Sequence, residues 1–378
     1  MSARPVLIVA GEKSGDNYGA ALVRAFRAID PTVPFFGIGG TAMEEAGVER
    51  IVPMDDLALI GLIEIIGHLP RLGRIFRRLA AEIKRRRPAA TVLIDSPDFN
   101  LRLAKRLKAL GVPVLYYIGP TVWAWRPGRL RTIRRRVRRM MLIFPFEREI
   151  YERAGISAAF VGHPLVERLR TTMDRAAFFA SRGLDPDRPL VVLMPGSRRG
   201  EIGNHLPVLG PALAPIKAAT GAQFLMIKAE NLDEDALRSG LPPDGPPVRI
   251  IDRGAYDALA AADLVLSSCG TANLEAALLG APLVAFYRLS PLTYALGTKL
   301  IRIRRFSIVN ILAEKALIPE LIQKDFTSAA LAAEAIRLLG SSEERDRLRA
   351  EFRRLKDVLG TAPASENAAR ELADLLRS

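Results

Sequence analysis

The sequence predicts an α/β protein with two Rossmann-like domains that face a central cleft. Its 378 residues exceed what one ordinary hydrophobic core organises. Short aliphatic runs alternate with longer helical patterns, which is typical of parallel sheets covered by helices. A charged stretch that Gly183, Pro186 and Pro189 punctuate interrupts the alternation, which then starts again. Two such series in one chain indicate two domains.

The first series predicts a parallel sheet in the N-terminal part of the chain. Its opening strand is followed by a glycine-rich turn and by a helical pattern from about Asn17. A second strand ends in acidic residues and precedes a helical pattern over Leu101–Leu110. The strands expected in this series are Pro5–Ala10, Thr91–Ile94, Pro113–Ile118 and Met140–Phe144.

The second series predicts another parallel sheet and sets the expected domain bounds. We expect an N-terminal domain over residues 1–175, a C-terminal domain over 176–345, and a helical segment over 346–378 that packs back on the N-terminal domain or stays with the C-terminal one. The strands expected in the second series are Leu190–Met194, Gln223–Ile227, Val248–Ile251, Leu264–Ser267 and Pro282–Phe286.

Composition and charge narrow the class of protein. Charged residues make up 25% and hydrophobic residues 49% of the chain, values that exclude a disordered or fibrous protein. The formal net charge of +14 favours anionic partners, which include nucleic acid, anionic lipid and phosphorylated substrates. The single cysteine, Cys269, excludes an internal disulfide framework and fits a reducing compartment.

Two polar turns follow strands of the first series. In parallel sheets ligands bind beyond the carboxyl ends of the strands. The turn Gly11–Asp16 contains Ser14 and offers free backbone N–H groups at the start of a helix, although it also fits a turn that merely begins one. It lacks the Walker spacing.

The second polar turn carries two carboxylates and is the candidate for acid–base chemistry. Asp95 and Asp98 follow the strand directly, and a carboxylate there can take a proton from an attacking hydroxyl. Asp98 or Asn100 could equally cap the next helix. No further acid cluster lies nearby and the chain has three histidines, so we expect no metal site.

Two turns of the second series are suited to a diphosphate. Arg198, in the turn Pro195–Glu201, can clamp phosphate oxygens, whereas Arg199 reads as a solvated charge. Gly270 and Thr271 open a second helix whose N–H groups would face a pyrophosphate. Glu275, one turn further, could hold ribose hydroxyls or simply stabilise the helix dipole.

These turns together resemble the lipid-A-disaccharide synthase family, inverting glycosyltransferases of the GT-B type with two Rossmann-like domains. The block PTVWAWR is specific, and the resemblance covers the chain nearly end to end. The stretches that carry it are Gly11–Asp16, Leu57–Gly67, Ile94–Asn100, Pro120–Arg126, Phe144–Glu147, Val161–Pro164, Pro195–Arg198, Gly270–Glu275 and Tyr287–Arg288.

The resemblance implies the substrates. The donor would be UDP-2,3-diacylglucosamine and the acceptor 2,3-diacylglucosamine 1-phosphate, giving a β-1,6-linked disaccharide phosphate and UDP without metal or cofactor. The acceptor would lie against Ser14, Asp16, Asp95, Asp98 and Asn100. The residues expected to bind UDP are Arg198, Gly270, Thr271 and Glu275.

The residue that acts as general base stays open between two candidates. Asp98 is preferred because it lies on the domain opposite the nucleotide turns, and His163, in the turn Gly162–Pro164, is its rival. One position departs from the family pattern, since Cys269 stands where a small residue such as Ser is usual. A thiol donates hydrogen bonds poorly, so only a backbone contact is expected there.

The acyl chains of such substrates imply work at a membrane surface. The apolar run Leu57–Leu69 is shorter than the roughly 20 residues that cross a bilayer, and arginines follow it from Arg71 to Arg87 and again over Arg126–Arg139. An apolar stretch beside a basic helix favours docking on anionic lipid, at the inner face of the bacterial inner membrane. A core helix with solvated arginines is the alternative.

Other functions fit the sequence less well. Nucleic-acid binding would explain the charge but not the four turns, and no recognised motif for it is present, so we expect no nucleic-acid partner. A UDP-sugar epimerase shares the two-domain plan but needs no lipid acceptor, and a lipid-binding module has no use for a nucleotide site. A homo-oligomer is compatible with the sequence.

Overall fold

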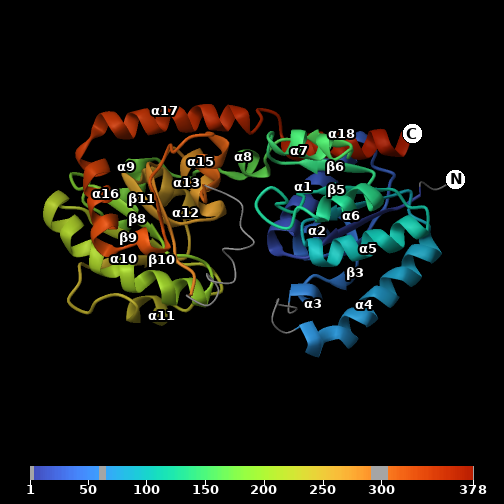
Figure 1. Cartoon of the computed structure of the whole chain (residues 1–378), viewed down its shortest axis with the longest axis horizontal. Coiled ribbons are helices and arrows are strands. Elements are labelled where there is room, and N and C mark those ends of the chain that lie inside the picture. The colour runs from blue at the N-terminus through green and yellow to red at the C-terminus, as the bar shows by residue number, and fades with distance from the viewer. Residues whose placement is uncertain (1–3, 59–64, 291–304, 378) are drawn as a thin grey trace. The chain divides into compact units, whose positions relative to one another are not determined.

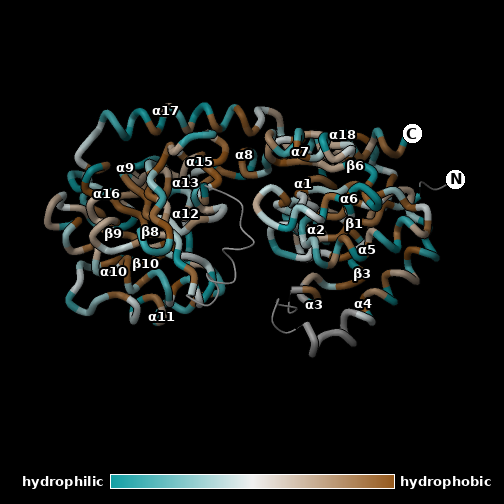
Figure 2. Tube along the Cα trace, in the orientation of Figure 1, coloured by the Kyte–Doolittle hydropathy of each residue, from teal (hydrophilic) through white to brown (hydrophobic). Residues whose placement is uncertain are grey.

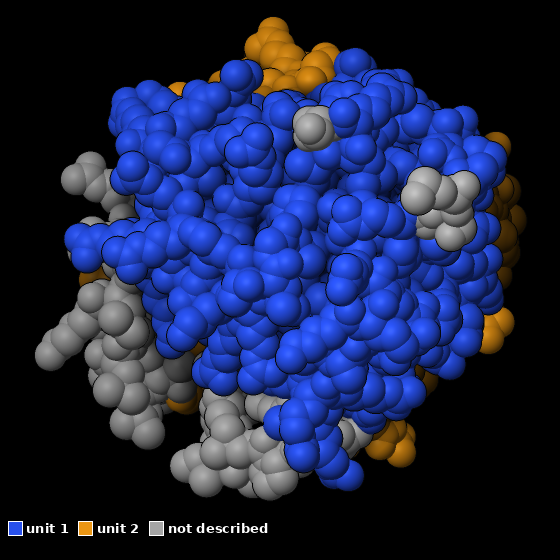
Figure 3. All heavy atoms as spheres, turned by 90° about the vertical axis from the view of Figure 1, so that its right-hand side faces the viewer, with its two compact units in different colours: residues 1–167, 359–378 blue, residues 168–358 orange. Residues whose placement is uncertain are grey.

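The computed structural model describes residues 4–58, 65–290 and 305–377 (Figure 1). The chain forms two compact units: unit 1 comprises Met1–Glu167 and Leu359–Ser378, and unit 2 comprises Arg168–Val358 (Figure 3). The boundary lies before the expected residue 175. The expected C-terminal segment is divided, because α17 (Ser342–Val358) belongs to unit 2 and α18 (Ala364–Arg377) to unit 1.

Unit 1 is built on a seven-stranded parallel sheet in the order β3-β2-β1-β4-β5-β6-β7. All five residues of β1 are fully buried, because helices cover both faces of the sheet. The strands are β1 (Val6–Ala10), β2 (Phe35–Gly39), β3 (Val48–Pro53), β4 (Ala90–Ile94), β5 (Val114–Tyr117), β6 (Arg139–Leu142) and β7 (Ala158–Phe160).

The two faces of this sheet carry separate cores. Val6 and Ile8 pack with α1 and α2, and with α18, which returns from the far end of the sequence. Leu7 and Val9 point the other way, into a core shared with α4, α5, α6 and α7. Figure 2 shows the hydrophobic interior of the unit. The helices are α1 (Lys13–Ile29), α2 (Thr41–Glu45), α3 (Asp55–Ala58), α4 (Ile65–Arg86), α5 (Pro97–Ala109), α6 (Arg129–Arg136), α7 (Glu147–Arg153) and α8 (Pro164–Arg168).

Unit 2 is built on a six-stranded parallel sheet in the order β10-β9-β8-β11-β12-β13. The strands are β8 (Leu190–Met194), β9 (Gln223–Ile227), β10 (Val248–Ile251), β11 (Leu264–Ser268), β12 (Leu283–Tyr287) and β13 (Glu320–Ile322). The helices, besides α17, are α9 (Arg175–Arg182), α10 (Arg199–Thr220), α11 (Glu234–Ser239), α12 (Ala255–Ala261), α13 (Thr271–Leu278), α15 (Ile308–Leu312) and α16 (Ser328–Gly340), with a 3-10 turn at Gln323–Asp325.

The two sheets share a topology that positions the candidate site. In unit 1, successive strands are added on one side of β1 up to β3, and the chain then returns to place β4 on the other side of β1. In unit 2, β8 and β11 are related in the same way. The crevice between such neighbouring strands, at their carboxyl ends, is where open α/β sheets bind ligands. Each unit therefore has one switch point, and the four polar turns follow β1, β4, β8 and β11.

No helix in the described part of the chain is both long enough and apolar enough to cross a bilayer. The apolar run Leu57–Leu69 lies largely outside the described residues, since residues 59–64 and the side chains of 58–72 are not among them. Among the side chains of this run only that of Leu57, which is buried in the core of unit 1, can be placed.

Candidate active site

The turns after β1 and β4 touch each other at the switch point of unit 1. A Cβ atom on Gly11 would collide with Oγ of Ser96, so the close approach of the two turns requires glycine at this position. Glu12 is the N-cap of α1 and its side chain forms no capping hydrogen bond. Ser14 lies exposed in the first turn of that helix.

The β4 turn is held in an unusual backbone conformation. Asp95 and Ser96 both adopt positive φ angles, 47° and 43°, which β-carbon sterics disfavour. Nδ2 of Asn100 donates to the carbonyl oxygens of Ile94 (3.0 Å) and Asp95 (2.7 Å), and the Tyr116 hydroxyl donates to Asp95 as well (2.6 Å). Asn100 is fully buried. It therefore fixes the turn, in place of the predicted contact with the acceptor.

Asp95 itself lies in an environment that disfavours its charge. Burial, reinforced by the nearby carboxylate of Glu12, raises the pKa of Asp95 to about 6. A half-buried carboxyl group that titrates near neutrality, at a switch point, is typical of catalytic sites.

Asp98 lies in the first turn of α5 and is the centre of a charged cluster. Its side chain is 61% exposed, and its Oδ1 pairs with Arg129 at 2.5 Å and with Arg126 at 3.7 Å. Both guanidinium groups lie over the ring of Trp125, at 4.4 and 5.3 Å from its centroid. We call Asp98, Trp125, Arg126 and Arg129 the arginine cluster. Both ion pairs use Oδ1, which leaves Oδ2 as the oxygen that can accept a proton.

The prediction that Asp16 faces the acceptor is wrong. Asp16 is 5% exposed, and its two oxygens accept hydrogen bonds from the backbone N–H groups of Gly40, Ala42 and Met43. It caps the start of α2 across the core face of α1. A buried carboxylate that takes three backbone donors is a structural element of the β2–α2 turn.

His163 is a poor candidate for the general base. Its Nδ1 accepts a hydrogen bond from the backbone N–H of Leu165 at 3.1 Å, so the neutral ring carries its proton on Nε2. Burial lowers the pKa of His163 to about 3. In this tautomer neither ring nitrogen can take a proton from a substrate hydroxyl.

A buried glutamate supports the loop that contains Trp123 and Trp125, and the sequence analysis assigned this glutamate no role. Glu147 is 2% exposed, and its Oε1 accepts from Nε1 of Trp123 at 3.2 Å. Burial, only partly offset by this hydrogen bond, raises the pKa of Glu147 to about 8. Phe146, which stacks on Phe144, meets Trp123 edge to face. The position of Glu147 in the segment Phe144–Glu147, which follows β6, was the sequence signal that could have indicated a role for it.

The turn after β8, at the switch point of unit 2, is organised by Glu201. Oε2 of Glu201 accepts from the backbone N–H groups of Ser197 (2.9 Å) and Arg198 (3.3 Å), and Oε1 accepts from the hydroxyl of Tyr287 (3.2 Å). Gly196 is required here, because its φ is +130° and a Cβ would collide with Glu201. Arg198, the N-cap of α10, is 79% exposed and available to an anion.

A buried histidine that the sequence did not single out connects two loops of unit 2. His205 is fully buried, its Nδ1 lies 2.6 Å from the carbonyl oxygen of Pro195, and its Nε2 accepts from the backbone N–H of Arg288 at 3.1 Å. The β8 turn and the end of β12 are thereby held in one arrangement.

The second turn at this switch point, after β11, leads into a helix whose start has no side-chain cap. Gly270 and Thr271 are exposed, and the N-cap Gly270 leaves the first N–H groups of α13 without a side-chain cap. Nδ2 of Asn273 donates to Oγ of Ser267 (2.9 Å) and to the carbonyl oxygen of Ser268 (3.0 Å). This buried asparagine fixes the turn much as Asn100 does after β4.

Glu275 and Cys269 flank this helix start. Burial raises the pKa of Glu275, and charge from Arg168 and a hydrogen bond with Tyr256 oppose the shift. Burial also raises the pKa of the Cys269 thiol, while its backbone N–H donates to the carbonyl oxygen of Phe286 at 2.8 Å. The thiol is therefore uncharged at neutral pH and the backbone contact is structural.

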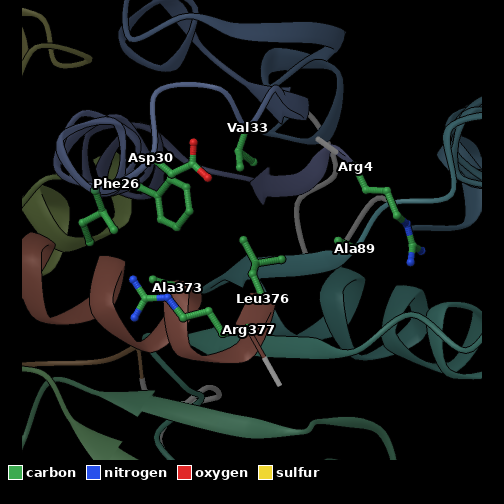
Figure 4. A pocket seen from close by; sticks show the side chains of 9 residues that line it. Arg4, Phe26, Asp30, Val33, Ala89, Ala373, Leu376 and Arg377 are labelled. Carbon is green, nitrogen blue, oxygen red and sulfur yellow. The ribbon is translucent and has the colours of Figure 1, made fainter. Parts of the chain in front are cut away.

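In the part of the chain that the structure describes, neither a metal centre nor the cavity of unit 1 coincides with the polar turns. Among the described residues no three His, Cys, Asp or Glu side chains come together as metal ligands would. A cavity of about 460 Å³ opens at the amino ends of the unit 1 strands, the edge opposite the polar turns (Figure 4). Its lining mixes apolar and charged side chains and comprises Arg4, Phe26, Ile29, Asp30, Val33, Ala89, Ala373, Leu376 and Arg377.

Solved structures similar to this one share its fold. The calicheamicin glycosyltransferase CalG4 matches with a TM-score of 0.63 and 16% identity, over 100% of this chain and 99% of that one. UDP-GlcNAc 2-epimerase from Neisseria meningitidis matches with a TM-score of 0.64 and 11% identity, over 99% and 100%. At such identities the likeness shows the fold alone, and it confirms the predicted α/β class of two Rossmann-like units, the GT-B architecture.

Sequence comparison is more specific. Lipid-A-disaccharide synthase of Geobacter sulfurreducens is 43% identical over 372 residues, which cover 98% of this chain and 97% of the relative. The enzyme of the same name from Syntrophus aciditrophicus is 43% identical over 371 residues, with the same coverage of both chains. A sequence model of the family described as lipid-A-disaccharide synthetase matches residues 6–373. The chain therefore belongs to the lipid-A-disaccharide synthetase family.

Proposed function

We propose that this glycosyltransferase moves 2,3-diacylglucosamine from UDP-2,3-diacylglucosamine to 2,3-diacylglucosamine 1-phosphate, forming a β-1,6-linked disaccharide 1-phosphate and UDP. Family membership over nearly the whole chain carries the proposal. The turns at the two switch points support it, since unit 1 offers carboxylates and unit 2 offers anion-binding groups.

Asp98 is the proposed general base. Oδ2 of Asp98 takes the proton of the acceptor's 6-hydroxyl, while the oxygen of that hydroxyl bonds to the anomeric carbon of the donor. The bond from that carbon to the diphosphate oxygen breaks, and its electron pair leaves with UDP. Attack opposite the leaving group inverts the anomeric configuration. Asp95 and Ser14, at the same edge of the sheet, are proposed to orient the acceptor.

Unit 2 is proposed to hold the nucleotide. The free N–H groups at the start of α13, with Thr271, would bind the diphosphate, and exposed Arg198 would add a guanidinium. These groups can stabilise the charge that develops on the departing diphosphate, so the proposal uses no metal ion or cofactor. Glu275 would hold the ribose hydroxyls.

The test is acceptor-dependent UDP release, measured in detergent with a chelator present. UDP should appear from UDP-2,3-diacylglucosamine only when the acylated sugar phosphate is added, and the chelator should leave the rate unchanged. Release of UDP without acceptor, or turnover of free UDP-GlcNAc, would point to an epimerase or hydrolase. Activity that disappears with chelator and returns with a divalent cation would contradict the metal-independent mechanism.

Replacing Arg198 by Ala is expected to weaken UDP binding about 5- to 30-fold, the loss of one charge-assisted contact to phosphate. Isothermal titration with UDP measures the effect. Arg199, the next residue, is exposed and assigned no contact, so Arg199→Ala is the matched control and should bind as wild type. Equal affinities in all three proteins would remove Arg198 from the diphosphate site.

We also propose that the enzyme works as a peripheral protein at the inner face of the bacterial inner membrane. Helices α4, α5 and α6 cover one face of the unit 1 sheet and carry a concentration of basic side chains. Each such residue near an anionic surface contributes roughly 1 kcal/mol to binding. The exposed basic residues on these helices include Arg74, Arg77, Arg78, Lys84, Arg85, Arg102, Lys105, Arg106, Lys108, Arg131, Arg134 and Arg135.

Changing Arg131, Arg134 and Arg135 together to Gln is expected to lower affinity for anionic vesicles at least about tenfold. Flotation with vesicles of phosphatidylcholine, with and without phosphatidylglycerol, measures it, and added salt should weaken binding of the wild type. The control changes three exposed arginines of α17, namely Arg347, Arg353 and Arg354, to Gln. If both triple variants bind like the wild type, this face does not dock on lipid.

A further inference from the structure

The arginine cluster contains two guanidinium groups and only one carboxylate, so one positive charge is not balanced within the cluster. Asp98 carries one negative charge, and the guanidinium groups of Arg126 and Arg129 face the same oxygen. Arg129 is 12% exposed and makes the short contact of 2.5 Å, so it is the structural partner of Asp98. Arg126 is 45% exposed and 3.7 Å away. Its charge is therefore the one that a ligand can reach.

The Arg126 guanidinium is held in place before any ligand arrives. Its Cζ atom lies 4.4 Å from the centroid of the Trp125 ring, and a cation over an aromatic face is attracted to it. The backbone at Arg126 has a φ of +51°, in the left-handed region that non-glycine residues seldom occupy. Trp123, two residues before Trp125, is anchored to buried Glu147. A strained and anchored loop at the carboxyl edge of the sheet indicates a functional constraint.

We propose that Arg126 binds the phosphate monoester of the acceptor and so makes unit 1 select a phosphorylated sugar. The inference rests on the proposed function and deepens it, because it assigns the one charged group of the acceptor to a side chain. Arginine binds phosphate through two parallel N–H donors, a geometry that a single carboxylate oxygen at 3.7 Å does not use.

The chemistry of the acceptor fits this placement. The 6-hydroxyl is carried on C5 through C6 and the 1-phosphate on C1, and these two ring carbons are joined by the ring oxygen. A base for the hydroxyl and a cation for the phosphate must therefore be neighbours without being the same group. Asp98 and Arg126 meet that condition. Arg129 stays with Asp98 when Arg126 turns to phosphate, so Asp98 keeps its orientation. The sugar is then held through both its 6-hydroxyl and its 1-phosphate.

The experiment compares two acceptors, 2,3-diacylglucosamine 1-phosphate and its dephosphorylated form, on three proteins. Arg126→Ala should lower kcat/KM about 10- to 150-fold for the phosphorylated acceptor, the loss expected for hydrogen bonds to a charged group. It should lower kcat/KM at most a few-fold for the dephosphorylated one. Arg126→Lys should restore part of the loss, since it returns the charge without the paired donors.

The control is Arg153→Ala, which removes an exposed arginine of unit 1 that also pairs with a carboxylate and should leave both rates unchanged. Equal losses on both acceptors would overturn the proposal, because Arg126 would then act through Asp98 alone. An unchanged rate on the phosphorylated acceptor would overturn it too. Wild-type protein that releases no UDP with either acceptor would instead refute the proposed function. Thermal unfolding and UDP affinity, compared with wild type, show that each variant is folded.

Discussion

Asp98→Asn should lower kcat about 10²- to 10⁴-fold, the range that a positioned general base contributes, while UDP binds as before. The amide is isosteric with the carboxylate but cannot take the hydroxyl proton. The nucleotide is proposed to bind unit 2, and Asp98 belongs to unit 1, so UDP affinity has no reason to change. Single-turnover UDP release and UDP titration measure the two quantities separately. Loss of UDP binding would mean that the site assignment is wrong.

Asp95 is the control that tests the choice of base. If Asp95 takes the proton, activity should require its carboxylate and rise as the pH passes through about 6, where this group titrates. Asp95→Asn would then abolish the reaction and Asp98→Asn would only weaken it. If Asp98 is the base, Asp95→Asn should act mainly on the KM for the acceptor. The two variants thus give opposite patterns in kcat and KM.

Strands with continuous aliphatic runs could be predicted from the sequence. β8, β9 and β10 begin and end at the predicted residues, and the other predicted strands differ by one or two residues at their ends. β2 was not predicted because its sequence, FFGIG, contains two glycines, and β3 because exposed Glu49 and Arg50 interrupt it. β7 and β13 have three residues each, too few to show a period.

The places of the polar turns followed from the order of strands and helices, but the roles of single side chains did not. Glycine and acidic residues after a strand predict a site at the carboxyl edge of a parallel sheet, and the turns after β1, β4, β8 and β11 lie there. Asp16 and Asn100 lie in the same turns, yet one caps α2 and the other holds its own turn. Those partners become visible only after folding.

Buried groups of the site were the least predictable. His205 lies within α10, and its partners Pro195 and Arg288 are separated from it by 10 and 83 positions. Glu147 meets Trp123 across 24 positions. A histidine within a helical pattern, or a glutamate at the start of a helix, is usually exposed. The position of Glu147 after a strand indicates that it lies near the sheet edge, but the sequence does not show that either side chain is enclosed. Their environment is produced by the tertiary packing of unit 1 or unit 2.

Glu147→Gln should make unit 1 more stable than the wild type above pH 8. At pH 5 the variant should be no more stable than the wild type. The pKa of Glu147 is about 8 in the folded chain, against the ordinary 4.5. Between these values the unfolded chain has lost the proton that the folded chain keeps, so wild-type stability falls as the pH rises through this window. Below 4.5 this group adds no pH dependence, and above 8 the full penalty of the buried charge applies.

The neutral amide of Gln removes that penalty and keeps an oxygen that can accept from Trp123. The free energy of unfolding, relative to wild type, should therefore increase by about 2–4 kcal/mol between pH 5 and pH 8.5. Both tryptophans of the chain, Trp123 and Trp125, lie in unit 1, so urea unfolding followed by tryptophan fluorescence reports on this unit.

Glu149→Gln, in the same helix and exposed, should show no such gain. Identical pH profiles for wild type and Glu147→Gln would mean that Glu147 is ionised in the folded chain. A gain confined to Glu147→Gln would show that the loop carrying Arg126 is anchored to an uncharged acid, and that its anchor weakens as the pH rises.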